Sequence, residues 1–177
     1  GLDVLVNNAG ISAHGRFLDS SPERLRKIME ANFFAAAELA REAGPLLAAG
    51  RQSVVVNIGS ILGHRGIPHT SEYCASKFAL HGWSESVRPE FALRGIDVLV
   101  VSPAATKTEL FDNLIERRGD RPWKEKRGDD AQLIARRTVA AIERGSKEVI
   151  PSWRGWAMVK ASRWFPRLMD RVLHRYG

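Results

Sequence analysis

Three short runs of apolar residues constrain the fold of this chain more than any other feature. They cover residues 4–10, 54–58 and 96–102, each ends in polar or small residues, and a fourth, shorter run covers residues 147–151. Strands that alternate with helices of a dozen or more residues form parallel crossovers. Because the runs are almost entirely apolar, both faces of their sheet must be covered. The sequence therefore predicts an α/β fold with a doubly wound parallel sheet, a Rossmann-like three-layer sandwich.

The segments between these runs carry helix start and stop signals. A Ser-Pro pair opens a helix over residues 21–47, and a second helix covers residues 71–94, with a glycine after it. Pro89 should kink that second helix or restart it. An aspartate caps a third helix over residues 129–144. Residues 151–177 form a basic, aromatic tail that is expected to be helical on both sides of its second proline.

The composition excludes several classes of protein. With 177 residues, 44% hydrophobic and 27% charged, the chain is long enough for one soluble globular domain. No stretch approaches the roughly 20 apolar residues that cross a bilayer. The net charge is +7, but the basic residues are dispersed and show neither zinc-finger spacing nor an RNA-binding aromatic motif, so we expect no nucleic-acid partner. The single cysteine, Cys74, and the absence of a leader pattern favour a reducing, cytoplasmic location.

Two residues four positions apart, Tyr73 and Lys77, carry the clearest chemical signal. Four residues are about one helical turn, so the phenol and the ammonium lie on the same helix face. A cation there favours the ionised phenol and lowers the tyrosine pKa from about 10. A shift to about 7 takes about 4 kcal/mol, which one close, partly desolvated charge can supply. Such a phenol exchanges a proton with a carbonyl or alcohol oxygen near neutral pH, whereas the bare pair also fits an amphipathic helix with a surface lysine.

The sequence around this pair resembles the short-chain dehydrogenase/reductase family. The matching elements follow the family's order: Asn7-Asn-Ala-Gly10, Asn32, Ser60, Tyr73-x-x-x-Lys77, and Ser102-Pro103 followed by Thr108. Most of them fall where predicted strands end, and ligands of open α/β sheets bind at those ends. The resemblance implies an NAD- or NADP-dependent enzyme, with residues 1–150 as the C-terminal two-thirds of its Rossmann-like catalytic domain and residues 151–177 as a tail of the same domain.

The resemblance also implies roles for the matching residues. Tyr73 is the general acid in ketone reduction or the base in alcohol oxidation, and Lys77 lowers its pKa and hydrogen-bonds the nicotinamide ribose. Ser60 holds the substrate oxygen and stabilises charge that develops on it. Asn32 anchors a water that relays protons to Lys77; the alternative is a helix residue bonded to nearby backbone.

A second set of matching residues is expected to bind the cofactor. Asn7, Asn8, Ala9 and Gly10 line the cofactor path and brace the central strand, Thr108 contacts the carboxamide or the phosphates, and Tyr73, Lys77 and Pro103 complete the set. The family normally has a glycine where this chain has Ala104. Its methyl group is expected to crowd the nicotinamide or to be absorbed by a small backbone shift, which weakens binding without abolishing it.

The other histidines and the aromatic residues leave alternatives open. His14, His64, His69 and His81 show no metal-ligand spacing, so we expect surface or loop roles and no metal site; His64, Arg65 and His69 flank the site and are candidates for substrate contact. Aromatic and apolar residues between positions 111 and 123 fit either a substrate lid or the packing of a surface helix.

The tail has tryptophans among basic residues, and two interpretations fit it. Trp153, Trp156, Trp164 and Phe165 stand among Lys160 and five arginines. The tail either packs on the substrate side or on a partner subunit, which we favour, or lies on an anionic membrane as a peripheral element. Flotation with anionic vesicles distinguishes the two.

These patterns lead to one main expectation and one alternative. We expect an NAD(P)-dependent oxidoreductase that interconverts a secondary alcohol and a ketone on a small apolar, steroid- or lipid-like molecule. In the intact enzyme the helices around Asn32 and Tyr73 form the interface of a homodimer or homotetramer. The alternative is a non-catalytic Rossmann-like fragment that binds a partner or has no function.

The glycine-rich phosphate turn generates the first testable prediction. The family begins with a strand, a Gly-x-x-x-Gly-x-Gly turn and a helix that holds the pyrophosphate, and no such pattern precedes Asn7. We therefore expect the polypeptide of residues 1–177 to bind dinucleotide weakly or not at all. Titration with NADH and NADPH, followed by fluorescence or calorimetry, checks this, and a micromolar Kd would contradict it.

Overall fold

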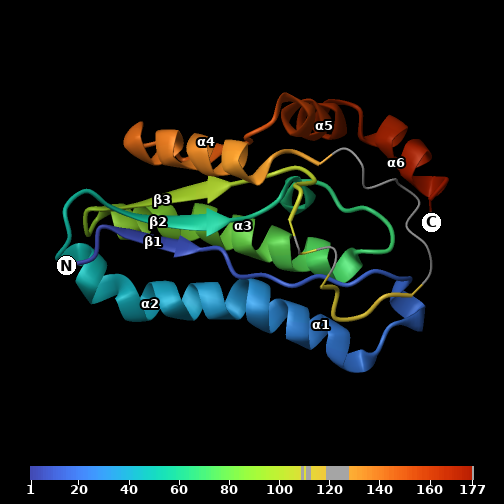
Figure 1. The fold of residues 1–177 in the computed structure, drawn as a ribbon, viewed down its shortest axis with the longest axis horizontal. Coiled ribbons are helices and arrows are strands. Elements are labelled where there is room, and N and C mark those ends of the chain that lie inside the picture. The colour runs from blue at the N-terminus through green and yellow to red at the C-terminus, as the bar shows by residue number, and fades with distance from the viewer. Residues whose placement is uncertain (109, 111–112, 119–127, 177) are drawn as a thin grey trace.

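A parallel β-sheet forms the middle layer of the protein (Figure 1). The computed structural model describes residues 1–108, 110, 113–118 and 128–176. Within them the strands lie in the order β1 (Val4–Asn7), β2 (Ser53–Ile58), β3 (Ile96–Val101) and β4 (Glu148–Val149), all parallel. The register pairs Asn7 with Asn57 and Ile58 with Val101, so the carboxyl ends of β1, β2 and β3 meet at one edge of the sheet.

Helices cover both faces of this sheet, which confirms the doubly wound prediction. On one face, α2 (Ala35–Ala48) and α3 (Ser71–Ala92) pack against β1, β2 and β3; on the other, α4 (Ala131–Glu143) packs against β3 and β4. Alternate strand residues enter the two cores because side chains along a strand point to opposite faces. Val55 packs with Ala40 and Leu47 of α2, whereas Val54 and Val56 share the opposite core with Ile134 of α4.

The edge strand β1 leaves part of one face uncovered. Val4 and Val6 are paired with Val54 and Val56, yet they remain 41% and 48% exposed. Because β1 is the first strand in the order, its outer backbone edge is also free within the described sheet. Strand β1 therefore has an open edge at Val4–Val6 within the described sheet, and such an edge can pair with another strand.

The first long helical segment contains a change of helix type. It starts at Pro22 after the N-cap Ser21, as predicted, and runs through α1 (Pro22–Met29), the π-helical turn η2 (Glu30–Phe34) and α2. A π-turn inserts one residue into the helical repeat and is frequent at functional sites. Asn32 lies within this turn and is buried.

The boundaries of the other helices are close to the predicted ones. Helix α3 ends two residues before the predicted position, and Gly95 follows with φ +70°. Helix α3 continues through Pro89, so of the two predicted outcomes, a kink or a restart, the restart does not occur. The cap of α4 is Asp130, whose carboxylate accepts a hydrogen bond of 3.1 Å from the Gln132 amide.

The C-terminal tail folds back over the loop that follows β2. It forms α5 (Trp153–Trp164) and α6 (Pro166–His174), as predicted. Val159 of α5 is buried, Asp170 of α6 pairs with Arg65, and the Tyr176 carbonyl lies 2.7 Å from Nε2 of His69. These contacts support the packing interpretation of the tail.

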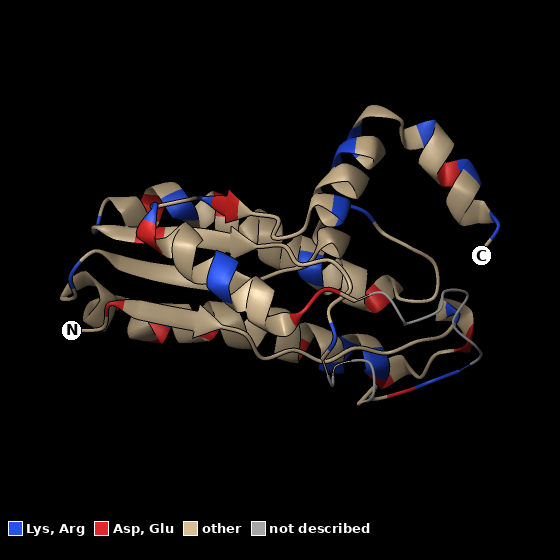
Figure 2. Ribbon diagram, turned by 45° about the horizontal axis from the view of Figure 1, so that its top comes forward, with Lys and Arg blue, Asp and Glu red and all other residues tan. Residues whose placement is uncertain are grey.

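Basic residues and exposed tryptophans lie on the surface of the protein. Figure 2 shows the lysine and arginine residues spread over many elements of the fold, including the tail, rather than in one stripe. Trp153 and Trp164 remain 73% and 74% exposed. None of the described helices combines the length and the apolar character that a bilayer span requires. Phe111 and Trp123, which the sequence suggests as lid residues, lie outside the described residues.

A close approach between η3 (Ile61–Gly63) and α3 generates the second prediction. A Cβ atom on Gly63 would lie 2.8 Å from the backbone oxygen of Lys77, which is too close for either backbone to remain in place. We expect Gly63→Ala to lower the free energy of unfolding by about 1–3 kcal/mol through overpacking. Gly66→Ala is the matched control, because no atom lies within 4 Å of its added Cβ. Urea unfolding compares the two variants, and equal stability would show that η3 moves without cost.

Candidate active site

Three side chains from two neighbouring elements meet at the carboxyl edge of the sheet. Ser60 follows β2, and Tyr73 and Lys77 lie one turn apart at the start of α3. The side chain of Ser60 is hydrogen-bonded to the Tyr73 phenol, and Nζ of Lys77 lies 5.6 Å from the centroid of the Tyr73 ring. The three residues are between 4% and 9% exposed. The structure therefore brings together the hydroxyl, the phenol and the amine that the sequence predicts as one site.

Ser60 is positioned by the strand end and by the turn that follows. Its Oγ accepts a hydrogen bond of 3.1 Å from the Leu62 amide, so the side chain caps η3. Immediately after it, the Ile61 amide donates to the carbonyl of Pro103, 3.0 Å away. This bond ties the end of β2 to the segment after β3. The Ser60 hydroxyl is thus held by the Leu62 amide, and the backbone next to it is held by the Pro103 carbonyl.

The ammonium group of Lys77 is buried and hydrogen-bonded to the backbone. Nζ donates to the carbonyl of Ile58 over 2.7 Å. An ammonium has three donors, and a Cβ placed on Gly10 would lie 3.8 Å from this nitrogen. Burial lowers the pKa of Lys77 from 10.5 to about 8. The side chain therefore carries a positive charge at neutral pH in a largely dehydrated position.

The expectation that Lys77 lowers the pKa of Tyr73 is wrong for this structure. Burial raises the pKa of Tyr73 to about 12, against the smaller opposing effect of the hydrogen bond with Ser60. Removing a phenolate from water costs more than these neighbours return. The ammonium contacts the ring rather than replacing the lost hydration of the oxygen, and it already donates to Ile58. At neutral pH the phenol is accordingly protonated.

Asn32 connects the π-turn to the loop after β1 and to α3. Its Oδ1 accepts from the Ile11 amide at 2.8 Å, and its Nδ2 donates to the Ile11 carbonyl at 3.0 Å and to Oγ of Ser76 at 2.9 Å. Its backbone partner thus lies 21 residues away in the sequence, outside the helix that carries it. These contacts make Asn32 a positioning residue for the loop that contains Gly10, and the proton relay through it stays a prediction.

The residues expected to bind the cofactor occupy three different environments. Asn7 is buried and donates to Oδ1 of Asn57 at 2.8 Å, which ties β1 to β2. Asn8 and Ala9 are exposed beside it, and Gly10 is half-buried. Thr108 is also exposed in the segment after β3.

The structure gives the Ala104 methyl group a neighbour that the sequence does not reveal. A Cβ placed on Gly155 of α5 would lie 3.2 Å from the Cβ of Ala104. The Ala104 methyl group therefore lies against Gly155, which has no side chain, in the first turn of α5. This contact favours the second of the two expected outcomes, in which the local structure absorbs the methyl group.

A buried ion pair next to Tyr73 escapes sequence reasoning. Arg24 of α1 and Glu72 of α3 are 1% and 2% exposed, and Arg24 Nε donates to Glu72 Oε1 over 2.8 Å. Glu116 lies 3.3 Å from the same guanidinium. Hydrogen bonds from Ser71 and Arg24 lower the pKa of Glu72 although burial opposes them. The pair is 48 residues apart in sequence, and buried ion pairs have no local sequence signal.

The loop facing this ion pair also holds a buried histidine. Of the surface or loop roles that the sequence predicts for His14, the structure shows a loop position with only 2% exposure, and its ring stacks on His69 with centroids 5.4 Å apart. Residues 12–14 run alongside residues 115–118, with the His14 amide bonded to the Glu116 carbonyl at 3.0 Å. The described part of the segment expected to form a lid is thus anchored to this loop.

The site fits a dinucleotide on its strand-end side. The ammonium of Lys77 has three N–H donors, and one of them bonds to the Ile58 carbonyl. Gly10 has no side chain to fill the space next to this ammonium. The exposed backbone at Asn8 and Ala9 continues the same edge. Such an arrangement suits ribose hydroxyls, which accept and donate hydrogen bonds.

Comparison with known proteins agrees with this geometry. The family model described as short chain dehydrogenase matches residues 1–119. Dehydrogenase/reductase SDR family member 7B of Bos taurus is 33% identical, with 95% of this chain and 54% of that protein aligned. Nodulation protein G of a Rhizobium species is 34% identical over 81% of this chain and 56% of its own length. The chain thus spans about half the length of the curated relatives it matches.

Solved structures show the same fold. A short chain dehydrogenase from Burkholderia cenocepacia in complex with NADP has a TM-score of 0.82 and 25% identity, covering 97% of this chain and 68% of its own. A short-chain dehydrogenase from Sphingobium yanoikuyae in complex with NADPH has a TM-score of 0.75 and 25% identity, covering 95% of this chain and 65% of its own.

The buried charge of Lys77 generates the third prediction. Its pKa of about 8 lies below the ordinary value of 10.5, so the folded state disfavours the charge and the unfolded chain binds the proton more tightly. The free energy of unfolding of the parent then rises with pH between about 8 and 10.5. At pH 7 the free energy of unfolding of Lys77→Met should exceed that of the parent by about 3 kcal/mol. This difference should shrink at pH 10.

Urea unfolding followed by tryptophan fluorescence measures both differences. Lys27→Met is the control, because Lys27 is exposed on α1. A Lys77→Met variant that is less stable than the parent at pH 7 would show that favourable contacts of the ammonium outweigh its burial.

Proposed function

The chain belongs to the short-chain dehydrogenase family, and we propose that Ser60, Tyr73 and Lys77 are the catalytic centre of an NAD(P)-dependent oxidoreductase. The reaction is the interconversion of a secondary alcohol and a ketone. One observation carries the proposal: the Ser60 hydroxyl is bonded to the Tyr73 phenol while the Lys77 ammonium lies against the same ring. Two proton donors and a cation around one point are what a carbonyl oxygen requires when it gains negative charge.

Tyr73 acts in this proposal as the acid of carbonyl reduction. Because its pKa is about 12, the phenol holds its proton throughout the neutral range and can donate it to the substrate oxygen. The Ser60 hydroxyl donates a second hydrogen bond to the same oxygen. The bound nicotinamide supplies or accepts the hydride, which neither side chain can do.

Lys77 stabilises the state in which Tyr73 has lost its proton. A cation 5.6 Å from the ring centroid attracts the phenolate that remains after donation. In the oxidative direction Tyr73 must be ionised before it accepts a proton, so alcohol oxidation should increase with pH while ketone reduction stays constant through neutral pH. Asn32 holds the loop beside Lys77, and we propose that a water on Asn32 returns protons to the lysine.

We propose that the cofactor and the substrate both bind at this site. We assign NAD or NADP to the edge formed by Asn8, Ala9, Gly10, Pro103, Ala104 and Thr108, which is supported by the solved relatives in complex with NADP and NADPH. A small apolar alcohol or ketone, steroid- or lipid-like, suits the proposal because the reacting groups lie in a largely dehydrated position. Residues 1–150 supply the catalytic part of the domain, and the tail lies beside it.

We also propose how the protein assembles and where in the cell it acts. Exposed apolar side chains line the outer surface of the helices around Asn32 and Tyr73, and they suit a homodimer or homotetramer interface: Phe34, Leu39, Leu46 and Phe78. The exposed Trp153 and Trp164 in the basic tail support a contact with an anionic membrane surface. We place the protein in the cytoplasm because its one cysteine, Cys74, is buried and free.

A non-catalytic fragment is the second candidate function. The uncovered face and free edge of β1 favour it, because this surface offers a strand to a partner. The two proposals differ in what they require of Tyr73: the enzyme needs its phenol, whereas a binding fragment needs only the apolar ring.

Substitution of Tyr73 generates the fourth prediction. In the full-length protein, Tyr73→Phe should reduce the rate of ketone reduction by roughly 10²–10⁴-fold, because the variant keeps the ring and loses only the proton donor. Tyr176→Phe is the matched control, since the second tyrosine of the chain lies at the end of the tail. NAD(P)H consumption with a panel of apolar ketones measures both, and undiminished turnover in Tyr73→Phe would remove Tyr73 from the mechanism.

A further inference from the structure

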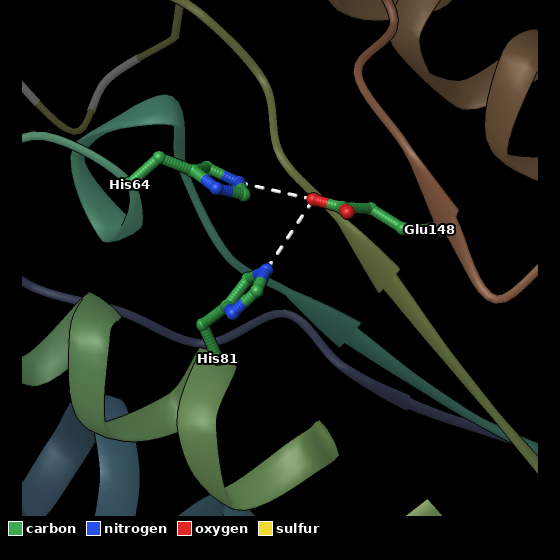
Figure 3. A group of neighbouring side chains, drawn as sticks. All are labelled: His64, His81 and Glu148. Carbon is green, nitrogen blue, oxygen red and sulfur yellow. Dashed lines mark hydrogen bonds and ion pairs between the residues drawn. The ribbon is translucent and has the colours of Figure 1, made fainter. Parts of the chain in front are cut away.

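Two histidines and a glutamate converge beside the proposed catalytic centre (Figure 3). His64 follows η3, His81 lies on α3 and Glu148 belongs to β4. Nε2 of His64 lies 3.0 Å, and Nε2 of His81 lies 3.3 Å, from the same carboxylate oxygen, Oε1 of Glu148. No metal-ligand spacing is visible along the chain, because neighbouring members of the cluster are 17 and 67 positions apart. Their proximity arises only when α3 and β4 pack on the same sheet edge.

The distances between the three donor atoms suit a small tetrahedral ion. Metal bonds of about 2.0–2.1 Å at tetrahedral angles place neighbouring ligand atoms about 3.3 Å apart. The two measured nitrogen–oxygen distances lie close to this value, and all three donor atoms lie within 4.8 Å of one another.

The chemistry and the exposure of the cluster also suit a metal. Two imidazole nitrogens with one carboxylate oxygen form a ligand set that binds zinc and neighbouring divalent transition metals. The side chains of His64 and His81 are 15% exposed, and that of Glu148 is 38% exposed. The cluster is therefore fixed by its surroundings but open to solvent on one side, which leaves a fourth position for water.

Neighbouring polar groups can orient the proposed ligands. The Glu85 carboxylate lies 3.9 Å from Nδ1 of His81, the nitrogen that does not face Glu148. A carboxylate on that side favours a proton on Nδ1, which leaves Nε2 to bind a metal. Oγ of Ser102 lies 3.1 Å from Nε2 of His64 and 3.5 Å from Oε1 of Glu148, so a hydroxyl also adjoins the centre of the cluster.

We propose that His64, His81 and Glu148 form a binding site for one divalent transition metal ion of the zinc type. The ion joins the turn after Ser60, the helix that carries Tyr73 and Lys77, and the edge strand β4. His64 is four residues beyond Ser60, and His81 is one helical turn beyond Lys77. Metal binding at this position stabilises the folded chain and fixes the distance between the two elements that carry the proposed catalytic groups.

Calorimetric titration of the tag-free chain with zinc chloride tests the proposal. We expect one ion per chain with a micromolar or lower Kd, together with a rise in Tm. Glu148→Gln and His81→Ala should each weaken binding roughly tenfold or more, because each removes one of three ligands. Glu148→Gln keeps the side-chain shape and removes the negative charge, and circular dichroism verifies that each variant is folded.

The matched control addresses the other close pair of histidines. His69→Asn removes the ring that stacks on His14, and asparagine tolerates the positive φ of 65° at this position. This variant should bind zinc as the parent does. Titration with cobalt(II), whose visible absorption reports tetrahedral nitrogen and oxygen ligands, gives an independent measurement on the unmodified chain. Absence of binding, or binding that is lost in His69→Asn and kept in Glu148→Gln, would overturn the proposal.

Discussion

Polar contacts along α3 determine where Tyr73 and Lys77 lie. The side chains of α3 bond to three other parts of the fold, α1, η2 and β2: Glu72 to Arg24, Ser76 to Asn32, and Lys77 and Ser84 to the Ile58 carbonyl and Asn57. These groups are almost completely buried, and a buried polar group without a partner costs about 1–3 kcal/mol. A rotation or a shift of α3 would break several contacts together. The helix is therefore held in one register against the sheet, and the positions of Tyr73 and Lys77 follow from that register.

Burial makes this arrangement suitable for proton donation and less suitable for proton abstraction. The same dehydration that raises the pKa of Tyr73 to about 12 lowers that of Lys77 to about 8. Both shifts favour the neutral form, since a charge loses hydration in either case. The phenol consequently holds a proton that it can deliver, while the ammonium is retained close to the pH at which it loses its charge. A pair that seemed from its spacing to favour the phenolate instead favours the phenol.

The elements around α3 contribute to the site in different ways. The π-turn η2 places Asn32 where it bonds to the backbone of Ile11, and η3 approaches the Lys77 backbone so closely that Gly63 has no room for a side chain. The tail covers the loop after η3 through Arg65 and His69. On the opposite side, β1 keeps an uncovered face and a free edge within the described sheet. The molecule is thus tightly constrained around the proposed catalytic groups and open at the strand that leads to the cofactor edge.

Local patterns were enough to predict the parallel sheet, the helices on both faces and most element boundaries, because apolar runs and caps such as Asp130 are short-range signals. Helical spacing singled out Tyr73 and Lys77, and the family resemblance added Ser60. The pKa of Tyr73, the burial of His14, the Arg24–Glu72 ion pair and the meeting of His64, His81 and Glu148 depend on tertiary packing. Each of these depends on the hydration and the distance of groups far apart along the chain. Local spacing fixes which side chains share a helix face, but only the packed fold determines which distant charges and dipoles replace the water that each group loses.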